Sequence, residues 1–307
     1  MQRTRSMRLV ALMATVALIA VACGDDDTGG ETDTDTDSGT EATDGGDGGD
    51  AAGGAGVEAL REAGVMRVGI KYDQPLFGVN TPGGVVGFDA EIAKLIGERV
   101  FDDFDPETHI EFTEAVSANR EPFLENDQVD IVAATYTIND ERDEVVDFAG
   151  PYYVAGQDIM VPSGNPEGIE GIDDLNTPDL KTCSVDGSTS IQNFEEQAPD
   201  GESITFDTYS KCAEAMADGR ADAVTTDNVI LIGLIDESDG AYELVDNPFT
   251  EEPYGIGVQE GSDLRCFING VLEEIYESGE WAEAYESTVG TAGSATPEPP
   301  AVDNEGC

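Results

Sequence analysis

The chain has 307 residues, enough for about two domains of ordinary size, and its hydrophobic fraction of 39% is sufficient to build a core. Its formal net charge is −52, and no cluster of Lys and Arg follows Arg8. Because nucleic acids and acidic lipid surfaces are recognised by clustered cations, the composition excludes nucleic acid as a partner.

The first 22 residues have the features of an export signal. Three Arg lie within the first eight residues, and an apolar run extends from Leu9 to Val21. This run is shorter than the roughly 20 residues that span a bilayer as a helix. It ends in small residues before Cys23, which resembles a bacterial lipobox, although Ala20 stands where that pattern usually has Leu.

We therefore predict a lipoprotein signal peptide over residues 1–22 and lipidation of Cys23, with ordinary signal cleavage as the alternative. A single acyl chain binds membranes only marginally, so a stable anchor requires a multiply acylated cysteine. The predicted location is the extracellular face of the cell membrane, or the periplasm if an outer membrane exists. Residues 24–56 contain eleven acids and no basic residue, so residues 23–56 are predicted to form a disordered acidic tether after the lipid.

Four cysteines remain once Cys23 carries the lipid: Cys183, Cys212, Cys266 and Cys307. In an exported chain they are expected to form disulfides, and four cysteines allow three pairings. A zinc site is the alternative, but no pair has the spacing of a zinc finger and His109 is the only histidine. We therefore expect no metal and no cofactor.

From Gly56 onward the sequence alternates between predicted strands and helices. In chain order these are a strand at 66–70, a helix at 88–100, a strand at 131–134, a helix at 212–216, a strand at 221–225 and helices at 268–276 and 281–285. Such alternation indicates α/β layers with largely parallel sheets. In these sheets ligands bind beyond the carboxyl ends of the strands.

Several segments carry more specific patterns. The motif ATYTINDER covers residues 134–142 and is followed by VDFAGPY at 146–152. Further matches, in the order of the chain, are VGIKYDQP at 68–75, GFD at 87–89, CSVDGSTS at 183–190 and DAVTTD at 222–227. Together these segments resemble the family 3 solute-binding proteins of ABC importers, which bind polar amino acids. The likeness is closest to the glutamate-binding lipoproteins of actinobacterial uptake systems.

The resemblance implies a periplasmic-binding-protein-like α/β fold, in which two lobes are joined by two hinge strands and the ligand cleft lies between them. The first lobe is expected to comprise residues 57–157 and 254–290, and the second residues 158–253. Residues 291–307 form a C-terminal tail. Such proteins close around their ligand by a hinge motion.

The resemblance also favours a Cys183–Cys212 disulfide, because both residues flank elements that the family packs side by side. We expect Cys266–Cys307 as the second pair, which ties the tail to a late helix. The expected partners are an acidic amino acid as ligand, the permease of an ABC importer, and the membrane through the lipid anchor. We expect the binding protein to be a monomer.

Three site residues of the first lobe follow from the ATYTINDER motif. Arg142 matches the family's carboxylate-binding arginine, and its planar guanidinium suits bidentate recognition of a carboxylate. Thr135 and Thr137 lie at a strand end, where backbone amides and a hydroxyl contact the same end of the ligand. The alternative for Arg142 is a surface ion pair.

The second lobe is expected to supply the opposing contacts. Ser188 and Thr189 open a helix, whose free N–H groups and dipole favour an anion. Asp227 matches the acid that pairs with the ammonium group of the ligand. The alternatives are a plain helix cap at Ser188 and a solvated carboxylate at Asp227.

Two scarce cations bear on selectivity. Lys71 and Arg120 match positions that meet the ligand side chain in this family, and binders of acidic amino acids carry basic residues there. Two cations at that end suggest glutamate or aspartate as the ligand. The alternatives are that both residues only neutralise nearby acids, or that another polar amino acid such as glutamine is bound.

Other functions remain possible on the same fold. Proteins similar to cyclohexadienyl dehydratase use it as an enzyme, and kinases and channels use it as a sensory domain. The sequence contains no Ser-His-Asp set, metal cluster or phosphate loop. We therefore predict a binding protein without enzymatic activity, with a ligand-binding accessory of a sensor as the alternative.

Overall fold

The structure is a computed structural model and describes residues 56–307. The predicted signal peptide, the lipidation site at Cys23 and nearly all of the acidic tether lie outside the described residues. Within the described residues, no helix is both long enough and apolar enough to span a bilayer.

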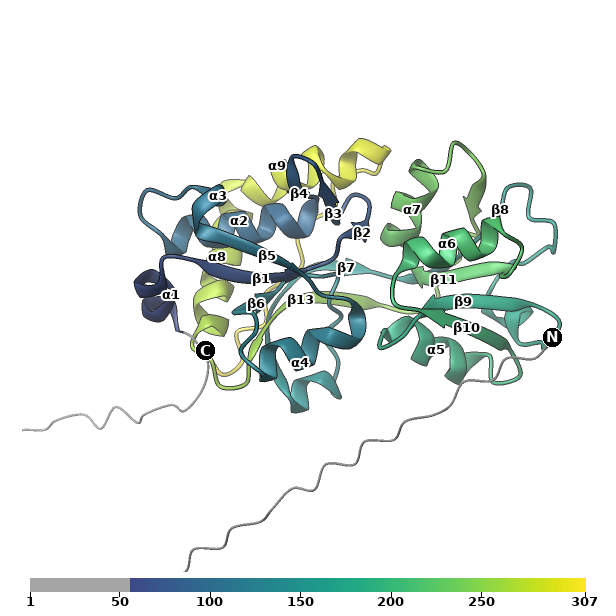
Figure 1. The fold of residues 1–307 in the computed structure, drawn as a ribbon, viewed down its shortest axis with the longest axis horizontal. Helices are drawn as coiled ribbons and strands as arrows, with labels where there is room; N and C mark the ends of the chain where they lie inside the picture. The colour runs from purple at the N-terminus through teal and green to yellow at the C-terminus, as the bar shows by residue number, and fades with distance from the viewer. Residues whose placement is uncertain (1–55) are drawn as a thin grey trace, which may run out of the picture. The chain divides into compact units, whose positions relative to one another are not determined.

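The first lobe is built on a five-stranded sheet with the strand order β5-β1-β6-β13-β7 (Figure 1). Its strands are β1 (Met66–Ile70), β5 (Ile110–Glu114), β6 (Ile131–Val132), β7 (Val146–Ala155) and β13 (Glu252–Gln259). β1 runs parallel to β5 and β6, whereas β13 runs antiparallel to β6 and β7.

The second lobe repeats this arrangement with the strand order β10-β9-β11-β8-β12. Its strands are β8 (Gln157–Pro162), β9 (Lys181–Val185), β10 (Glu202–Phe206), β11 (Ala223–Asp227) and β12 (Tyr242–Leu244). β9 is parallel to β10 and β11, and β8 is antiparallel to β11 and β12. Each sheet therefore combines three parallel strands with antiparallel ones, and the predicted α/β class is confirmed.

A small antiparallel sheet follows β1 and completes the strands. It contains β2 (Asp73–Gln74), β3 (Gly78–Thr81) and β4 (Gly84–Val86). The helices are α1 (Val57–Ala63), α2 (Phe88–Val100), α3 (Pro106–His109), α4 (Arg120–Glu125), α5 (Thr189–Gln197), α6 (Tyr209–Ala217), α7 (Asn228–Asp236), α8 (Leu264–Ser278) and α9 (Glu280–Ser287). Short 3-10 turns lie at Ser117–Asn119, Arg142–Glu144, Ile172–Leu175 and Val289–Ala292.

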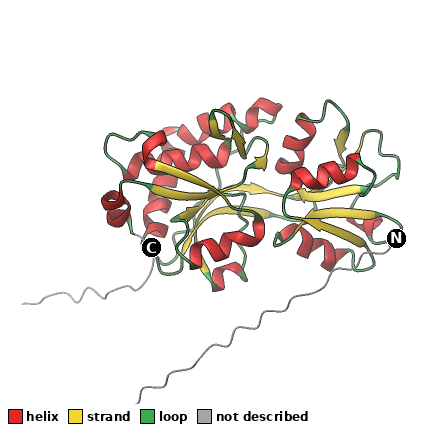
Figure 2. Cartoon of the chain, viewed as in Figure 1, coloured by secondary structure: helices red, strands yellow, loops and turns green. Residues whose placement is uncertain are grey.

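Helices cover both faces of each five-stranded sheet (Figure 2). In the first lobe, Ile131 packs into a core shared with α2, α8 and α9, while the next residue, Val132, packs into a core shared with α4. In the second lobe, Val224 faces α6 and α7, and Ala223 faces α5. Successive side chains of a strand point to opposite faces, so strands buried on both sides appear in the sequence as continuous apolar runs.

Two long segments connect the lobes. β7 leads through Gly156 into β8 of the second sheet, and β13 returns the chain to the first sheet, where it pairs with β7. The predicted boundaries at residues 157/158 and 253/254 fall within β8 and β13. We propose them as the limits of the two lobes.

Two predicted strands differ in extent from the observed ones. The strand predicted at 131–134 ends at Val132, because Thr135 adopts a φ of 44° and turns the chain away from the sheet. The strand predicted at 221–225 begins two residues later, at Ala223, since Ala221 still closes the turn after α6 by donating to the carbonyl of Ala215. β11 also continues two residues beyond its predicted end and so terminates at Asp227.

The structure contains both of the disulfides preferred above. Cys183 of β9 is bonded to Cys212 of α6, with Cα atoms 5.5 Å apart, and both residues are fully buried. Cys266 of α8 is bonded to Cys307, with Cα atoms 5.3 Å apart. The second bond fastens the C-terminal tail to α8.

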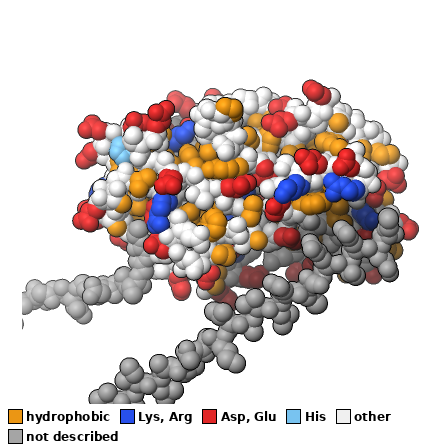
Figure 3. Space-filling model, viewed as in Figure 1, with side chains coloured by type: hydrophobic (Ala, Val, Ile, Leu, Met, Phe, Trp, Pro, Cys, Tyr) orange, Lys and Arg blue, Asp and Glu red, His pale blue; other side chains and the backbone are white. Residues whose placement is uncertain are grey.

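Acidic side chains are spread over the visible face of the molecule, and basic ones are few (Figure 3). Of the Lys and Arg residues that the structure describes, only three are buried. They are Lys71, Arg120 and Arg142. Because buried charges are costly unless they are compensated, these three cations indicate a region that binds negatively charged groups.

Candidate functional site

A pocket between the lobes gathers five of the eight predicted ligand-binding residues. Its lining residues are Ser117, Arg120, Thr135, Ser188, Thr189, Ser190, Tyr209, Thr226, Asp227 and Ile230. The first three come from the first lobe and the others from the second. Lys71, Thr137 and Arg142 do not line this pocket directly.

Thr135 lies three residues beyond β6 and is held by two side chains of the first lobe. Its N–H donates to the carboxylate of Asp89 at 2.9 Å, and its hydroxyl donates to Oε1 of Gln74 at 2.9 Å. Asp89 also accepts a 2.5 Å bond from the hydroxyl of Tyr152. Burial raises the pKa of Asp89 to about 7. This support was not foreseen, although Asp89 belongs to the GFD motif.

Lys71 and Arg120 form the positive side of the site. Nζ of Lys71 donates to Oγ of Ser117 at 2.8 Å, and Ser117 lines the pocket. Burial lowers the pKa of Lys71 well below its ordinary value, and the charge of Arg120 lowers it further. Among the residues that the structure describes, neither cation forms an ion pair with a carboxylate.

Arg120 is fixed by backbone carbonyl groups. Its Nε donates to Ser117 O, and its Nη1 donates to Ala134 O and Thr135 O, each at 3.2 Å. Its Nη2 reaches Gly187 O of the second lobe at 3.4 Å. Neutral acceptors leave the charge of the guanidinium uncompensated, so the pocket is electropositive on this side.

Arg142 lines a second pocket, of about 500 Å³, to which both lobes also contribute. Its Nε donates to Glu121 at 3.0 Å, and its Nη1 donates to the carbonyl of Thr137 at 2.6 Å. Arg142 and Arg120 both lie over the ring of Tyr136, with their guanidinium carbons 4.9 Å and 4.3 Å from its centroid, and Nη2 of each donates to Gly187 O of the second lobe. Burial, and then the charge of Arg120, lower the pKa of Arg142 to about 10.

The N-terminus of α5 forms the wall on the second lobe. Ser188 caps this helix, since its Oγ accepts from the N–H of Ile191 at 3.1 Å. The Ser188 hydroxyl also donates to Val185 O at 2.7 Å. Thr189 and Ser190 occupy the first turn, where N–H groups have no partner within the helix. Ser188 therefore both caps α5 and lines the pocket.

Asp227 supplies the negative side. It ends β11, and its Oδ2 accepts a 2.5 Å bond from the hydroxyl of Tyr254. Its Oδ1 is buried and has no hydrogen-bond partner among the described residues. Burial raises the pKa of Asp227 to about 7, and the charge of Glu252 adds to the shift. A buried carboxylate oxygen of this kind accepts readily from a cationic donor.

Several lining residues were missed from the sequence. Ser117 precedes Arg120 by three residues, and this proximity was its only signal. Tyr209 lies in an amphipathic helix, where an aromatic residue is typical of a core position. Thr226 belongs to the DAVTTD segment, in which only Asp227 was assigned a role, and Ile230 lies in an apolar stretch that predicts only burial.

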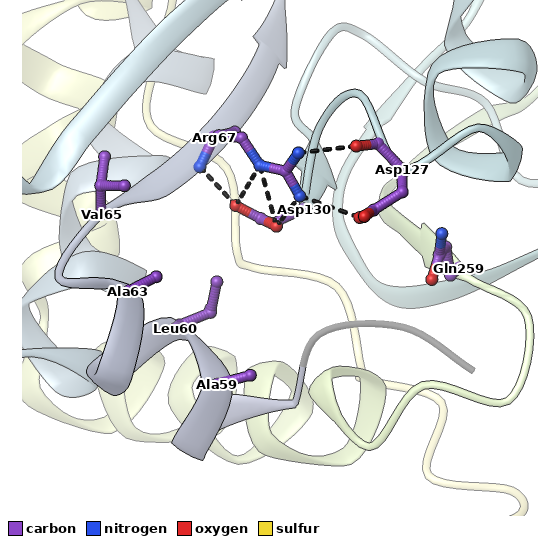
Figure 4. Close-up of a pocket in the computed structure, with 8 residues that line it drawn as sticks. All are labelled: Ala59, Leu60, Ala63, Val65, Arg67, Asp127, Asp130 and Gln259. Carbon is purple, nitrogen blue, oxygen red and sulfur yellow. Dashed lines mark hydrogen bonds and ion pairs between the residues drawn. The ribbon is translucent and has the colours of Figure 1, made fainter. Parts of the chain in front are cut away.

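A more spacious pocket lies away from this site, on the first lobe between α1 and β1 (Figure 4). Its volume is about 480 Å³, and it contains none of the predicted site residues. Its one basic residue, Arg67, is already paired with Asp130 at 2.6 Å and Asp127 at 2.9 Å. Its lining therefore offers no unpaired positive charge to a carboxylate ligand.

Metal-binding groups are not assembled in the part of the chain that the structure describes: no set of three or more His, Cys, Asp or Glu residues could hold an ion. His109 ends α3, and its ring stacks on Phe101 with centroids 4.9 Å apart. The pocket itself is lined by Arg120, Asp227 and several hydroxyl side chains, which offer both charges and hydrogen bonds to a small zwitterion.

Comparisons with known proteins agree with this geometry. Residues 66–291 match the model of the bacterial extracellular solute-binding proteins, family 3. The chain is 35% identical over 292 residues to the ABC transporter glutamine-binding protein GlnH of Bacillus subtilis, covering 94% of this chain and 98% of that protein. It is 40% identical over 240 residues to the glutamate-binding protein GluB of Corynebacterium glutamicum, covering 74% and 79%, respectively.

A solved structure shows the same fold. An ancestral arginine-binding protein bound to glutamine superposes with a TM-score of 0.67 and 34% identity, covering 73% of this chain and 97% of that one. The matched family model and both relatives are described as solute-binding or amino-acid-binding proteins. The chain therefore belongs to family 3 of the bacterial extracellular solute-binding proteins, as an amino-acid-binding component of an ABC transporter.

Proposed function

We propose that this protein captures glutamate or aspartate for import. The observation that carries the proposal is the buried pair Lys71 and Arg120, which have no carboxylate partner among the described residues. A buried cation is stable only when it is compensated. The side-chain carboxylate of an acidic amino acid accepts charge-assisted bonds from both cations, whereas an amide does not repay their desolvation.

The common part of every amino acid is then bound by the remaining residues. Asp227 accepts from the ligand ammonium through its free Oδ1. The N-terminus of α5, with Ser188 and Thr189, faces the α-carboxylate. Thr135 and Thr137 contribute from the first lobe, and Arg142 takes part by exchanging Glu121 for the ligand.

Glutamine is the competing ligand. The relatives support both, since one is a glutamine-binding protein and another a glutamate-binding protein. The charge distribution favours the acidic ligand because its side-chain carboxylate accepts from Arg120 and favours the charged form of Lys71, whose pKa burial lowers, whereas glutamine offers only a neutral amide. A ligand-binding accessory of a sensor is a second alternative, and it differs in the partner rather than in the pocket.

We further propose that Cys23 carries a lipid and that the monomeric protein works at the extracellular face of the membrane, delivering its ligand to the permease. The support is the export signal and the membership of an extracellular family. Metabolic labelling with palmitate tests the anchor: Cys23→Ser should abolish incorporation. Labelling that persists in this variant would contradict it.

A thermal-shift panel of the twenty amino acids tests the ligand. Glutamate and aspartate should raise the melting temperature, because ligand binding to the native state stabilises it by mass action. The ligand should be recovered unchanged by mass spectrometry. A response to glutamine but not to glutamate would overturn the acidic-ligand proposal, and chemical conversion of the ligand would indicate an enzyme.

A further inference from the structure

The segment that follows Lys71 belongs to the first lobe and contacts the second lobe. β2 and the adjoining Pro75 lie against α6 and α7 of the second lobe (Figure 1). Asp73, Gln74 and Pro75 do not line the ligand pocket, whereas Tyr209 of α6 and Ile230 of α7 do. The contact therefore joins the lobes beside the ligand rather than through it.

Asp73 makes the polar part of this contact. Its Oδ2 accepts from the N–H of Tyr209 at 2.8 Å and from the N–H of Ser210 at 3.2 Å. These are the first two residues of α6, whose N–H groups have no partner within the helix. The N-cap residue, Thr208, forms no side-chain cap bond. The first lobe thus provides the cap for a helix of the second lobe.

Gly233 makes the steric part. It lies inside α7, where alanine is the more favourable residue by helix propensity. A Cβ at this position would lie 2.4 Å from the carbonyl oxygen of Pro75, which is too close for any side chain. Gly187 is similar across the pocket, where a Cβ would lie 2.7 Å from Cα of Ala118. Both glycines permit close approach of the two lobes.

We propose that Asp73 is a positioning residue for ligand capture: it latches the lobes together by capping α6, and it thereby holds Tyr209 in the pocket wall, while Gly233 leaves room for the latch. The inference rests on amino-acid capture in this pocket and not on the identity of the ligand side chain. Because the two bonds exist only when the lobes are together, they stabilise the closed state selectively. Their loss accelerates opening and release.

The test uses the full chain with L-glutamate and L-glutamine as probes, and it measures association and dissociation rates by stopped flow. Asp73→Ala should raise the dissociation rate roughly 10- to 100-fold for whichever probe binds, with little change in the association rate. Asp207→Ala is the matched control, since this exposed aspartate also precedes α6 but pairs only with Lys211. It should behave as the wild type.

Two further variants separate the latch from other effects. Asp73 also raises the pKa of Lys71 through its charge, so Asp73→Asn removes the charge but keeps an acceptor. Partial recovery by Asp73→Asn supports the latch, and a loss equal to that of Asp73→Ala contradicts it. If Asp73→Ala lowers the free energy of unfolding of the unliganded protein by as much as it lowers the binding free energy, the latch is also contradicted, because such a result indicates a purely structural role for Asp73.

The steric part has its own matched pair. Gly233→Ala should weaken binding by at least about 10-fold, whereas Gly270→Ala should not, because Gly270 lies in α8 with no atom within 4 Å of its Cβ position. Wild-type affinity in both Gly233→Ala and Asp73→Ala would overturn the proposal. If the wild type binds glutamine alone, the acidic-ligand proposal fails while the latch is still tested.

Discussion

Replacing Arg120 with Gln should reduce the affinity for glutamate far more than the affinity for glutamine. Arg120 is buried, and three backbone carbonyls at 3.2 Å hold its guanidinium at the pocket wall. A hydrogen bond to a charged group contributes about 1.5–3 kcal/mol, against about 0.5–1.5 kcal/mol for a neutral one. The difference of about 1–2 kcal/mol narrows the ratio of the two affinities by roughly 5- to 30-fold.

The ratio is the informative quantity because the substitution also removes donors from those carbonyls. That loss affects both ligands equally. Isothermal titration calorimetry with each ligand gives the ratio directly, and Lys211→Gln serves as the control because it removes an exposed lysine that pairs with Asp207. Equal losses for glutamate and glutamine would refute the reasoning and assign Arg120 to the support of the fold.

Three further predictions follow from the site and the disulfides. Arg142→Ala should weaken the binding of every amino-acid ligand by on the order of 2–5 kcal/mol. The double variant Arg142→Ala/Glu121→Gln shows whether the unpaired Glu121 causes the loss, and near-native affinity of Arg142→Ala would show that Arg142 is not part of the site. The pKa of Asp227 is raised to about 7 without ligand, and a ligand ammonium favours its ionised form, so the affinity for the ligand should fall as the pH drops below about 7. Calorimetry in buffers of different ionisation enthalpy should detect proton release on binding, and a pH dependence that persists in Asp227→Asn would show that another group titrates. Replacing Cys183 and Cys212 together with Ser should lower the free energy of unfolding by about 3 kcal/mol, as measured by urea denaturation, and an unchanged midpoint would contradict a stabilising role.

Much of the fold could be predicted because its determinants are local. The strand at 66–70 and the helix at 88–100 were predicted with the observed bounds, since apolar spacing and flanking polar residues define them. The turn at Thr135 was not predicted, because a positive φ in a non-glycine residue depends on the surrounding contacts with Asp89 and Gln74.

The candidate site was predicted less completely. Motif resemblance identified the residue types, but it did not reveal that Arg142 pairs with Glu121 and lies over the ring of Tyr136. Asp73 and Tyr209 are separated by 136 residues, so nothing local in the sequence indicates their contact. Contacts that depend on how one lobe meets the other become visible only in three dimensions.

The central claim is that the pocket selects an acidic amino acid. Calorimetric titration of the wild-type protein with L-glutamate and L-glutamine near pH 7.5 tests it most directly. Because the side-chain carboxylate of glutamate pairs with Lys71 and Arg120, we expect glutamate to bind at least roughly 30-fold more tightly than glutamine. Glutamine binding as tightly as glutamate, or more tightly, would contradict the claim.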